Sequence, residues 1–260
     1  MAGRVGVEKQ GSIGWIVFDQ PERHNAISVD MWRQIPAAAQ QLDADDAVRV
    51  VIMRGAGEAA FVAGADISEF EQRRSGDNIE EYDRDNARAF VALASIGKPV
   101  IAMIHGFCVG GGVALSLSAD LRYAADDAQL GIPAARLGLG YGMAGIETLS
   151  QLVGPSNAKE IFFTARRFPA QRALDMGLLN AVFPKAQLES DVVAIAEQIA
   201  KNAPLTVRSV KVAVRELLKA PAARDLDAVK RAIAACYGSD DYREGVSAFM
   251  QKRSPQFKGR

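Results

Sequence analysis

The chain has 260 residues, of which 49% are hydrophobic and 24% charged, and its 31 basic residues balance its 31 acidic ones. This composition is typical of a globular protein with a sizeable core, and it excludes an intrinsically disordered chain. A nucleic-acid-binding domain carries a net basic surface, so the zero net charge disfavours that class.

The few cysteines and histidines disfavour a disulfide-rich protein and a metalloprotein with histidine ligands. Cys108 and Cys236 are too few for a disulfide framework and indicate a reducing compartment. His24 and His105 are the only histidines, so we expect no His-rich metal site within one chain. The N-terminus lacks a signal-peptide pattern, and the longest apolar stretches are far shorter than the ~20 residues of a membrane span. We expect a soluble, cytoplasmic protein that does not enter a membrane.

The first 150 residues alternate between strands, loops and helices, which predicts an α/β fold with buried parallel strands. Ser28 is expected to cap a helix that Pro36 kinks or ends. The glycine- and alanine-rich segment 55–67 is expected to be a loop. The remaining patterns predict strands at 14–19, 49–54, 98–106, 121–125 and 128–132, and helices at 78–95 and 110–120.

The second half of the sequence is helical. Apolar residues at helical spacing predict helices at 155–164, 170–176, 186–202, 205–219, 222–237 and 240–252. The composition shifts near residue 200, which divides the chain into a core at 1–200 and a helical region at 201–260. We expect the helical region to pack on a partner subunit.

Two possible functional sites, a dinucleotide site and a Ser-His-Asp triad, are disfavoured by the residues around them. GYGMAG at 140–145 matches the glycine pattern of a dinucleotide site, but no strong strand precedes it and positions 162–168 contain no acid. A Ser-His-Asp triad would have to use His24, in a polar loop, or His105, at the end of an apolar strand. We interpret both histidines as structural.

Two glycine-rich loops each follow a buried strand. They are FVAGADI at 61–67 and HGFCVGGG at 105–112. Small residues let backbone N–H groups approach a ligand closely, and two such loops side by side can direct two donors at one oxygen. The alternative for either loop alone is tight helix–sheet packing. The pair, after two similar strands, favours an oxyanion hole.

The order and spacing of several motifs resemble the enoyl-CoA hydratase/isomerase (crotonase) family over nearly the whole chain. The motifs are QPERHNAI, FVAGADI, KPVIAMIHGFCVGGGVAL, SADLRYAADDAQLGIP, GPSNAKEIFFTARRFPAQRALDMGLLNAVFP and DDYREGVSAFMQKRSPQF. The resemblance implies a spiral of ββα repeats with a C-terminal helical trimerisation region, assembled as a homotrimer or a homohexamer. It also implies a coenzyme A thioester as substrate and no permanently bound cofactor.

The family's site residues transfer onto matching positions. The oxyanion-hole donors match the backbone N–H groups of Ala65 and Gly111. The residues of family members that contact the adenosine part of coenzyme A match Arg23, Ala63, Asp66 and Ile67. In relatives, the positions of Phe249 and Lys252 reach the coenzyme A of a neighbouring subunit.

The sequence departs from the family at its two usual hydratase glutamates, which hold the attacking water and move protons. The corresponding positions are Ala114 and Ala134. A methyl group cannot transfer protons, and a positioned acid–base group contributes roughly 10²–10⁴-fold to rate. We therefore expect the rate of ordinary hydration to be very low.

Other polar residues lie near the expected acyl site. Tyr141 matches a tyrosine of the methylmalonyl-CoA decarboxylase branch, to which this chain is partly similar, and Glu147 is a candidate acid or a solvated helix residue. Arg136 is either a polar group near the acyl chain or the ion-pair partner of an acid such as Asp120. Three functions follow: a hydratase or isomerase of uncertain reaction, a decarboxylase that uses Tyr141, and a non-catalytic acyl-CoA binder.

Overall fold

The computed structural model describes residues 3–67 and 78–260. Its strands form two sheets, one of six strands in the order β1-β2-β3-β5-β7-β10 and one of four in the order β4-β6-β8-β9. All pairings are parallel except β1 with β2 and β8 with β9. The strands are β1 Arg4–Gln10, β2 Ile13–Asp19, β3 Val50–Gly55, β4 Ala60–Val62, β5 Val100–Ile104, β6 Phe107–Val109, β7 Leu121–Ala125, β8 Gln129–Gly131, β9 Phe168–Pro169 and β10 Ala181–Phe183.

Helices separate the strand pairs. The α-helices are α1 Val29–Ala44, α3 Asn78–Ser95, α4 Gly111–Leu117, α5 Met143–Thr164, α6 Ala170–Asp175, α7 Leu188–Ala200, α8 Pro204–Leu218, α9 Leu226–Tyr237 and α10 Asp240–Met250. The short 3₁₀ segments are η1 Pro21–Arg23, η3 Ala134–Leu137, η4 Lys185–Gln187 and η5 Pro221–Ala223. None of these described helices is long and apolar enough to cross a bilayer.

Consecutive strands alternate between the two sheets. The pairs β3/β4, β5/β6 and β7/β8 each place one strand in the large sheet and one in the small sheet, and a helix follows each pair. This repetition is the ββα spiral expected from the sequence, and the α/β fold class is confirmed. It also brings the ends of β4 and β6, which are far apart in sequence, to the same edge of the small sheet.

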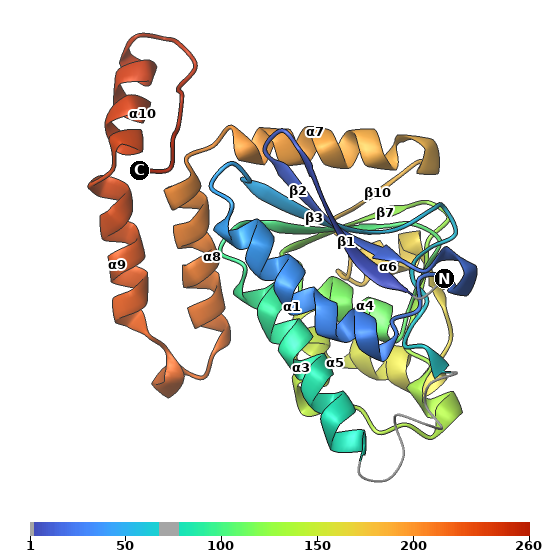
Figure 1. Cartoon of the computed structure of the whole chain (residues 1–260). Coiled ribbons are helices and arrows are strands. Elements are labelled where there is room, and N and C mark those ends of the chain that lie inside the picture. The colour runs from blue at the N-terminus through green and yellow to red at the C-terminus, as the bar shows by residue number, and fades with distance from the viewer. Residues whose placement is uncertain (1–2, 68–77) are drawn as a thin grey trace.

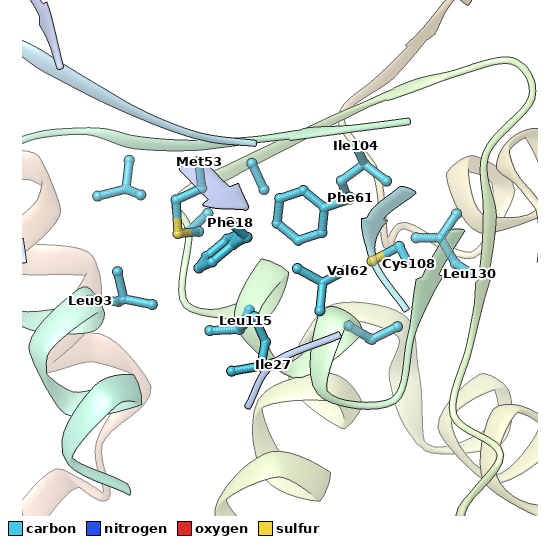
Figure 2. Packing of buried hydrophobic residues seen from close by; sticks show 14 of the residues in the cluster. Phe18, Ile27, Met53, Phe61, Val62, Leu93, Ile104, Cys108, Leu115 and Leu130 are labelled. Carbon is cyan, nitrogen blue, oxygen red and sulfur yellow. The ribbon is translucent and has the colours of Figure 1, made fainter. Parts of the chain in front are cut away.

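The large sheet is covered on both faces, which explains its nearly continuous apolar strands. Alternate residues of β2, β3 and β5 face either α7 or the helices α1, α3 and α4 on the other side (Figure 1). Between the large sheet, the small sheet and α4, Phe18 meets Phe61 edge-on with ring centroids 5.7 Å apart (Figure 2). This packing fixes β4 and its following loop against the body.

Several expected element boundaries were wrong. Pro36 neither ends α1 nor divides it, because burial of the apolar face around Ile35 and Leu42 outweighs the ~3 kcal/mol cost of a helix-interior proline. The two glycine-rich segments contain the short strands β4 and β6, which form by pairing with each other. Helix α5 begins at Met143, earlier than expected, and turns at Gly154, whose φ of 75° suits glycine.

The last three helices stand apart from the sheets. Helices α8 and α9 lie side by side, and α9 and α10 extend away from the body (Figure 1). Helix α8 buries only Ser209 and Glu216. Its attachment to the body is polar: the side chain of Lys211 donates to the Asp120 carboxylate at 2.7 Å and to the Lys98 carbonyl at 2.8 Å.

Candidate active site

The loops that follow β4 and β6 meet at one point. Strands β4 and β6 are parallel neighbours, so the loop at 63–67 and the glycine run at 110–112 leave the same edge. A Cβ added at Gly111 would lie 3.5 Å from the amide nitrogen of Ala65. The structure thus brings Ala65 and Gly111 together, 46 residues apart in the sequence, as the two loops predicted.

The amide N–H groups of Ala65 and Gly111 donate to no acceptor among the residues that the structure describes. The peptides around Ala65 are fixed, because Ile27 N–H donates to the Gly64 carbonyl at 2.8 Å and Asp66 N–H donates to the Ile27 carbonyl at 2.9 Å. Buried or half-buried backbone donors normally find a partner. Two neighbouring unpaired donors on a rigid backbone can therefore bind one oxygen from a ligand.

Two of the glycines in this run are required by the structure, for different reasons. A Cβ at Gly112 would lie 2.1 Å from the Val62 carbonyl oxygen, so no larger residue fits between α4 and β4. Gly110 has a φ of 53° and a ψ of −111°, a conformation that suits glycine. By contrast, a Cβ at Gly111 meets only ordinary van der Waals contacts. Backbone conformation therefore accounts for Gly110 and close packing accounts for Gly112, but neither requires glycine at position 111.

A second cluster lies beside Ala65. The guanidinium of Arg23 contacts the carboxylate of Asp66 at 2.5 Å, and the Gln20 amide lies 3.3 Å from the same carboxylate oxygen. The Ala63 N–H donates to the His24 carbonyl at 3.0 Å, which joins this cluster to the strand edge. Asp66 is buried, whereas Arg23 remains half-exposed and can meet an anion from solvent.

Ile67 is the last described residue of this loop and is 59% exposed. The four positions matched to adenosine binding, Arg23, Ala63, Asp66 and Ile67, therefore lie together next to Ala65.

The two alanines that the family resemblance matches to the usual glutamates lie in α4 and at the start of η3. Ala114 is half-buried and Ala134 is buried, with 8% of its surface exposed. Neither supplies an acid, a base or a hydrogen-bonding side chain at its position.

Tyr141 lies half-buried just before α5. Its ring meets Phe162 edge-on at 4.9 Å, and burial raises the pKa of its hydroxyl to about 12. Tyr141 therefore keeps its proton at neutral pH, so its hydroxyl can donate a hydrogen bond but is not available as a base. Glu147 lies on the exposed side of α5, where the Gln151 amide donates to it at 3.4 Å. That placement favours the solvated interpretation of Glu147 over the catalytic one.

The predicted ion pair between Arg136 and Asp120 is wrong. Asp120 pairs instead with Lys211 of α8, whose side chain reaches it across 91 residues of sequence. Arg136 is exposed on η3 and forms no ion pair within residues 3–67 and 78–260. The remaining interpretation of Arg136, a polar group near the acyl site, stays a prediction.

The structure separates Phe249 and Lys252 from the other candidate residues. Both lie at the end of α10, exposed to solvent, and α10 lies at the far end of the helical region from the N-terminal strands (Figure 1). Within one chain they do not meet Arg23 or Asp66.

The two histidines differ in environment. His105 is buried, and its Nε2 has no hydrogen-bond partner in the described part of the chain. His24 is exposed, with its ring edge-on to Phe107 at 5.7 Å. Their interpretation as structural residues stays a prediction.

Trp32 is a core residue that borders the glycine run. This side chain of α1 is 2% exposed, and its Cζ2 atom lies 3.6 Å from the position of a Cβ at Gly111. A tryptophan on the apolar face of an amphipathic helix looks like any other core residue in the sequence, so no sequence signal could have identified it.

Comparison with known proteins decides the family. The sequence pattern of the enoyl-CoA hydratase/isomerase family matches residues 8–260. The chain belongs to the enoyl-CoA hydratase/isomerase family. It is 33% identical to the short-chain-enoyl-CoA hydratase of Clostridium acetobutylicum, over 98% of this chain and 97% of that protein. It is also 34% identical to the peroxisomal Delta(3,5)-Delta(2,4)-dienoyl-CoA isomerase of Arabidopsis thaliana, over 95% and 92% of the two chains.

Solved structures of enoyl-CoA hydratase/isomerase family members share the architecture. A crystal structure described as an enoyl-CoA hydratase/carnithine racemase from Magnetospirillum magneticum superposes with a TM-score of 0.94, at 32% identity over 98% of this chain and 96% of that one. The enoyl-CoA hydratase from Bacillus anthracis gives 0.92, at 33% identity over 98% and 99%. The resemblance on which the sequence analysis relied is therefore confirmed for family and fold.

Proposed function

We propose that this family member is an acyl-CoA thioester enzyme that binds the thioester oxygen with the backbone N–H groups of Ala65 and Gly111. The supporting observation is that these two donors lie next to each other and lack partners among the described residues. When an acyl-CoA loses a proton or a carboxylate at the carbon next to the thioester, negative charge moves onto the carbonyl oxygen. Two preorganised donors stabilise that enolate-like charge more than they stabilise the neutral thioester.

The coenzyme A part of the substrate has a matching surface in this proposal. Its adenosine end lies along Arg23, Ala63, Asp66 and Ile67, beside Ala65. Arg23 supplies a positive charge at the solvent edge, and Asp66 holds its guanidinium in place. A phosphate-bearing ligand gains a charge-assisted contact there.

Assembly completes the site. Phe249 and Lys252 reach the coenzyme A of a neighbouring subunit, in a homotrimer or a dimer of trimers. Their exposure at the end of α10 supports this arrangement, because they contribute nothing to a site within their own chain. The helical region at 201–260 is then the oligomerisation region, and the core at 1–200 carries the oxyanion hole.

The reaction is not ordinary hydration in this proposal, because Ala114 and Ala134 supply no proton-transferring group. A second candidate is decarboxylation of a malonyl-type thioester. Tyr141 supports it, since the hydroxyl keeps its proton and half-buried aromatic packing surrounds the ring. In that reaction the bond to the carboxylate breaks, its electrons move to the enolate oxygen, and carbon dioxide leaves.

The test of the oxyanion hole is the substitution Gly111→Ala. Its methyl group would lie 3.5 Å from the Ala65 nitrogen and would fill the place that a bound oxygen needs, while the backbone N–H and the fold remain. We expect turnover of the best acyl-CoA substrate to fall by roughly 10²-fold, because the methyl group displaces the carbonyl oxygen from both donors by about 1 Å. Gly6→Ala in β1, where a Cβ also meets only ordinary contacts, is the matched control and keeps wild-type turnover.

The substrate set is crotonyl-CoA, methylmalonyl-CoA and longer enoyl-CoA thioesters, with products identified by mass spectrometry. Water gain identifies a hydratase and carbon dioxide loss identifies a decarboxylase. Because an isomerase leaves the mass unchanged, only an unchanged mass together with an unchanged chromatographic retention time identifies a non-catalytic binder. If no substrate turns over, acetyl-CoA affinity replaces turnover as the measurement. Gly111→Ala with unchanged turnover or affinity would refute the oxyanion hole.

A further inference from the structure

Arg167 is an exposed cation without an ion-pair partner in the described part of the chain. The guanidinium groups of its neighbours Arg166 and Arg172 both pair with Glu160, at 2.6 Å and 3.1 Å. Arg167 instead lies over the ring of Phe107, with its guanidinium carbon 5.1 Å from the ring centroid. Its positive charge is therefore free to meet an anion from solvent.

The small sheet determines where this cation lies. Leu130 of β8 and Phe168 of β9 are register partners and are both buried in the core. Because side chains alternate between the two faces of a sheet, Arg167 and Gly131 belong to the opposite, outer face. The Cα atom of Arg167 lies 3.2 Å from the position of a Cβ at Gly131. From there the side chain crosses the outer face of β8 to reach Phe107 on β6.

The contact with Phe107 restrains the guanidinium without using its hydrogen-bond donors. A guanidinium that lies over an aromatic ring is attracted through the ring face, and its N–H groups stay free to bind an anion. The Phe107 ring is itself braced by His24, which meets it edge-on at 5.7 Å. A restrained guanidinium with free N–H groups suits the oxygen atoms of a phosphate, which it can bind in pairs.

His24 joins this surface to the positions that the sequence matches to adenosine binding. Its carbonyl accepts the Ala63 N–H at 3.0 Å, and Arg23 directly precedes it. His24 has a φ of 52°, a left-handed conformation that costs a residue other than glycine free energy and occurs often at functional sites. The Arg167–Phe107 contact therefore borders the adenosine positions, at the start of β6, whereas the glycine run of the oxyanion hole follows the other end of β6.

We infer that Arg167 binds the 3′-phosphate of coenzyme A. This inference rests on the proposed function, which places adenosine along Arg23, Ala63, Asp66 and Ile67. The diphosphate of coenzyme A leads from the ribose towards the thioester, whereas the 3′-phosphate is a separate monoester on the same ribose. A cation beside the adenosine positions, at the end of β6 away from the glycine run, suits the 3′-phosphate better than the diphosphate. That monoester carries about −1.5 to −2 charges at pH 7, which favours a guanidinium partner.

The substrate class is therefore a thioester of complete coenzyme A, rather than one carried on phosphopantetheine alone. The test compares coenzyme A with 3′-dephospho-coenzyme A, which differ only in this phosphate, by isothermal titration calorimetry. The wild-type protein binds coenzyme A about 10-fold more tightly, the effect of one charge-assisted contact. Arg167→Gln removes the charge, so it lowers the affinity for coenzyme A by about 10-fold, leaves that for the dephospho form unchanged, and abolishes the preference.

Arg166→Gln is the matched control. Arg166 is also exposed and lies over an aromatic ring, that of Phe168 at 4.7 Å, but its charge is already paired with Glu160. This variant keeps the preference for coenzyme A. Phe107→Leu keeps apolar bulk under Arg167 but removes the ring, and it reduces the preference.

The outcomes separate the inference from the proposed function. Equal affinity of the wild-type protein for the two ligands would overturn the inference alone. Equal losses of both ligands in Arg167→Gln would also overturn it, because Arg167 would then contact a part of the ligand that both share. Loss of the preference in Arg166→Gln would show that general surface charge, not this contact, is responsible. If the wild-type protein binds neither coenzyme A nor acetyl-CoA, the proposed function itself fails, and the inference fails with it.

Discussion

At the scale of single residues, the candidate site is defined as much by what is missing as by what is present. In the proposed site, Ala65 and Gly111 contribute only backbone, whereas Ala114 and Ala134 offer methyl groups at the positions that the family resemblance matches to carboxylates. The two glycine-rich loops predicted that two backbone donors could meet, and the family resemblance identified them as Ala65 and Gly111. The short parallel strands β4 and β6 that bring the two loops to one edge were not predicted. The sequence could not predict the partner of Asp120, because Lys211 arrives from α8, a distant part of the chain.

Restoring the two carboxylates should restore hydration. We expect the wild-type protein to hydrate crotonyl-CoA very weakly, and the double substitution Ala114→Glu plus Ala134→Glu to gain more than either single one. Two groups that hold one water act as a unit, so their effects are not additive. A crotonyl-CoA hydration assay measures this, and a thermal melt of each variant identifies misfolding at the buried position 134. Hydration by the wild-type protein at the rate of ordinary family members would contradict the prediction.

His105 should make the protein less stable in mild acid. Burial, and then the charge of Lys185, lower the pKa of His105 below its usual 6.5, although Asp127 opposes them. His105 therefore binds a proton near pH 6.5 in the unfolded chain, but only at a lower pH in the folded protein. The free energy of unfolding should be constant above about pH 6.5 and should fall as the pH decreases below it, towards the pKa of the folded state.

The measurement is chemical denaturation at a series of pH values. His105→Phe should flatten this part of the profile, because it removes the group that titrates. His24→Asn, which accommodates the positive φ of 52° at an exposed position, should leave the profile unchanged. An identical pH profile for the wild-type protein and His105→Phe would show that His105 does not control stability in this range.

At the scale of elements, the sequence predicted the strands that have a clear local pattern of apolar residues, but not those that form through pairing with distant residues. Strands β3 and β5 were evident because both of their faces are covered and their apolar runs are unbroken. Strand β1 was missed because it lies at an edge and carries Arg4, Glu8 and Lys9 on exposed positions. Strand β9 has two residues and exists through pairing with Gln129 and Leu130, which no local pattern encodes.

The polar attachment of α8 should be sensitive to one lysine. Lys211 is 12% exposed and bonds both Asp120 and the Lys98 carbonyl, so Lys211→Met leaves the Lys98 carbonyl without this donor and the Asp120 carboxylate with the Val100 N–H but without its ion pair. We expect the free energy of unfolding to fall by about 1–3 kcal/mol. Denaturant titration measures it. Lys230→Met, which breaks an exposed pair with Asp227, is the control and should change stability by less than about 0.5 kcal/mol. Equal effects of the two substitutions would show that α8 is held by other contacts.

At the scale of the whole molecule, the helical region exposes more apolar surface than a single chain can cover. A groove of about 550 Å³ runs between α8, α9 and α10, and Ile233, Val246 and Phe249 line it. Exposed apolar patches of this kind mark interaction surfaces. The positions of these apolar residues along the helices could be predicted from helical periodicity, whereas their exposure to solvent could be seen only in the folded chain.

Light scattering should give three or six times the chain mass of 27.8 kDa at micromolar concentration. Ile233→Glu puts a charge into the groove and should shift the mass towards that of one chain. Lys230→Glu, one turn earlier on α9 and exposed, should keep the assembly. A wild-type mass of 27.8 kDa would contradict the proposed oligomer.

The two thiols of the chain lie in opposite settings. Cys108 is enclosed in the core beside Phe61, and burial raises the pKa of its thiol to about 12, so it stays protonated and out of reach of alkylating reagents (Figure 2). Cys236 lines the groove between the terminal helices. The unaltered protein therefore offers one attachment point for a fluorescent or spin label, placed where subunits are proposed to meet. Its labelling rate would follow association and dissociation directly, without an engineered cysteine.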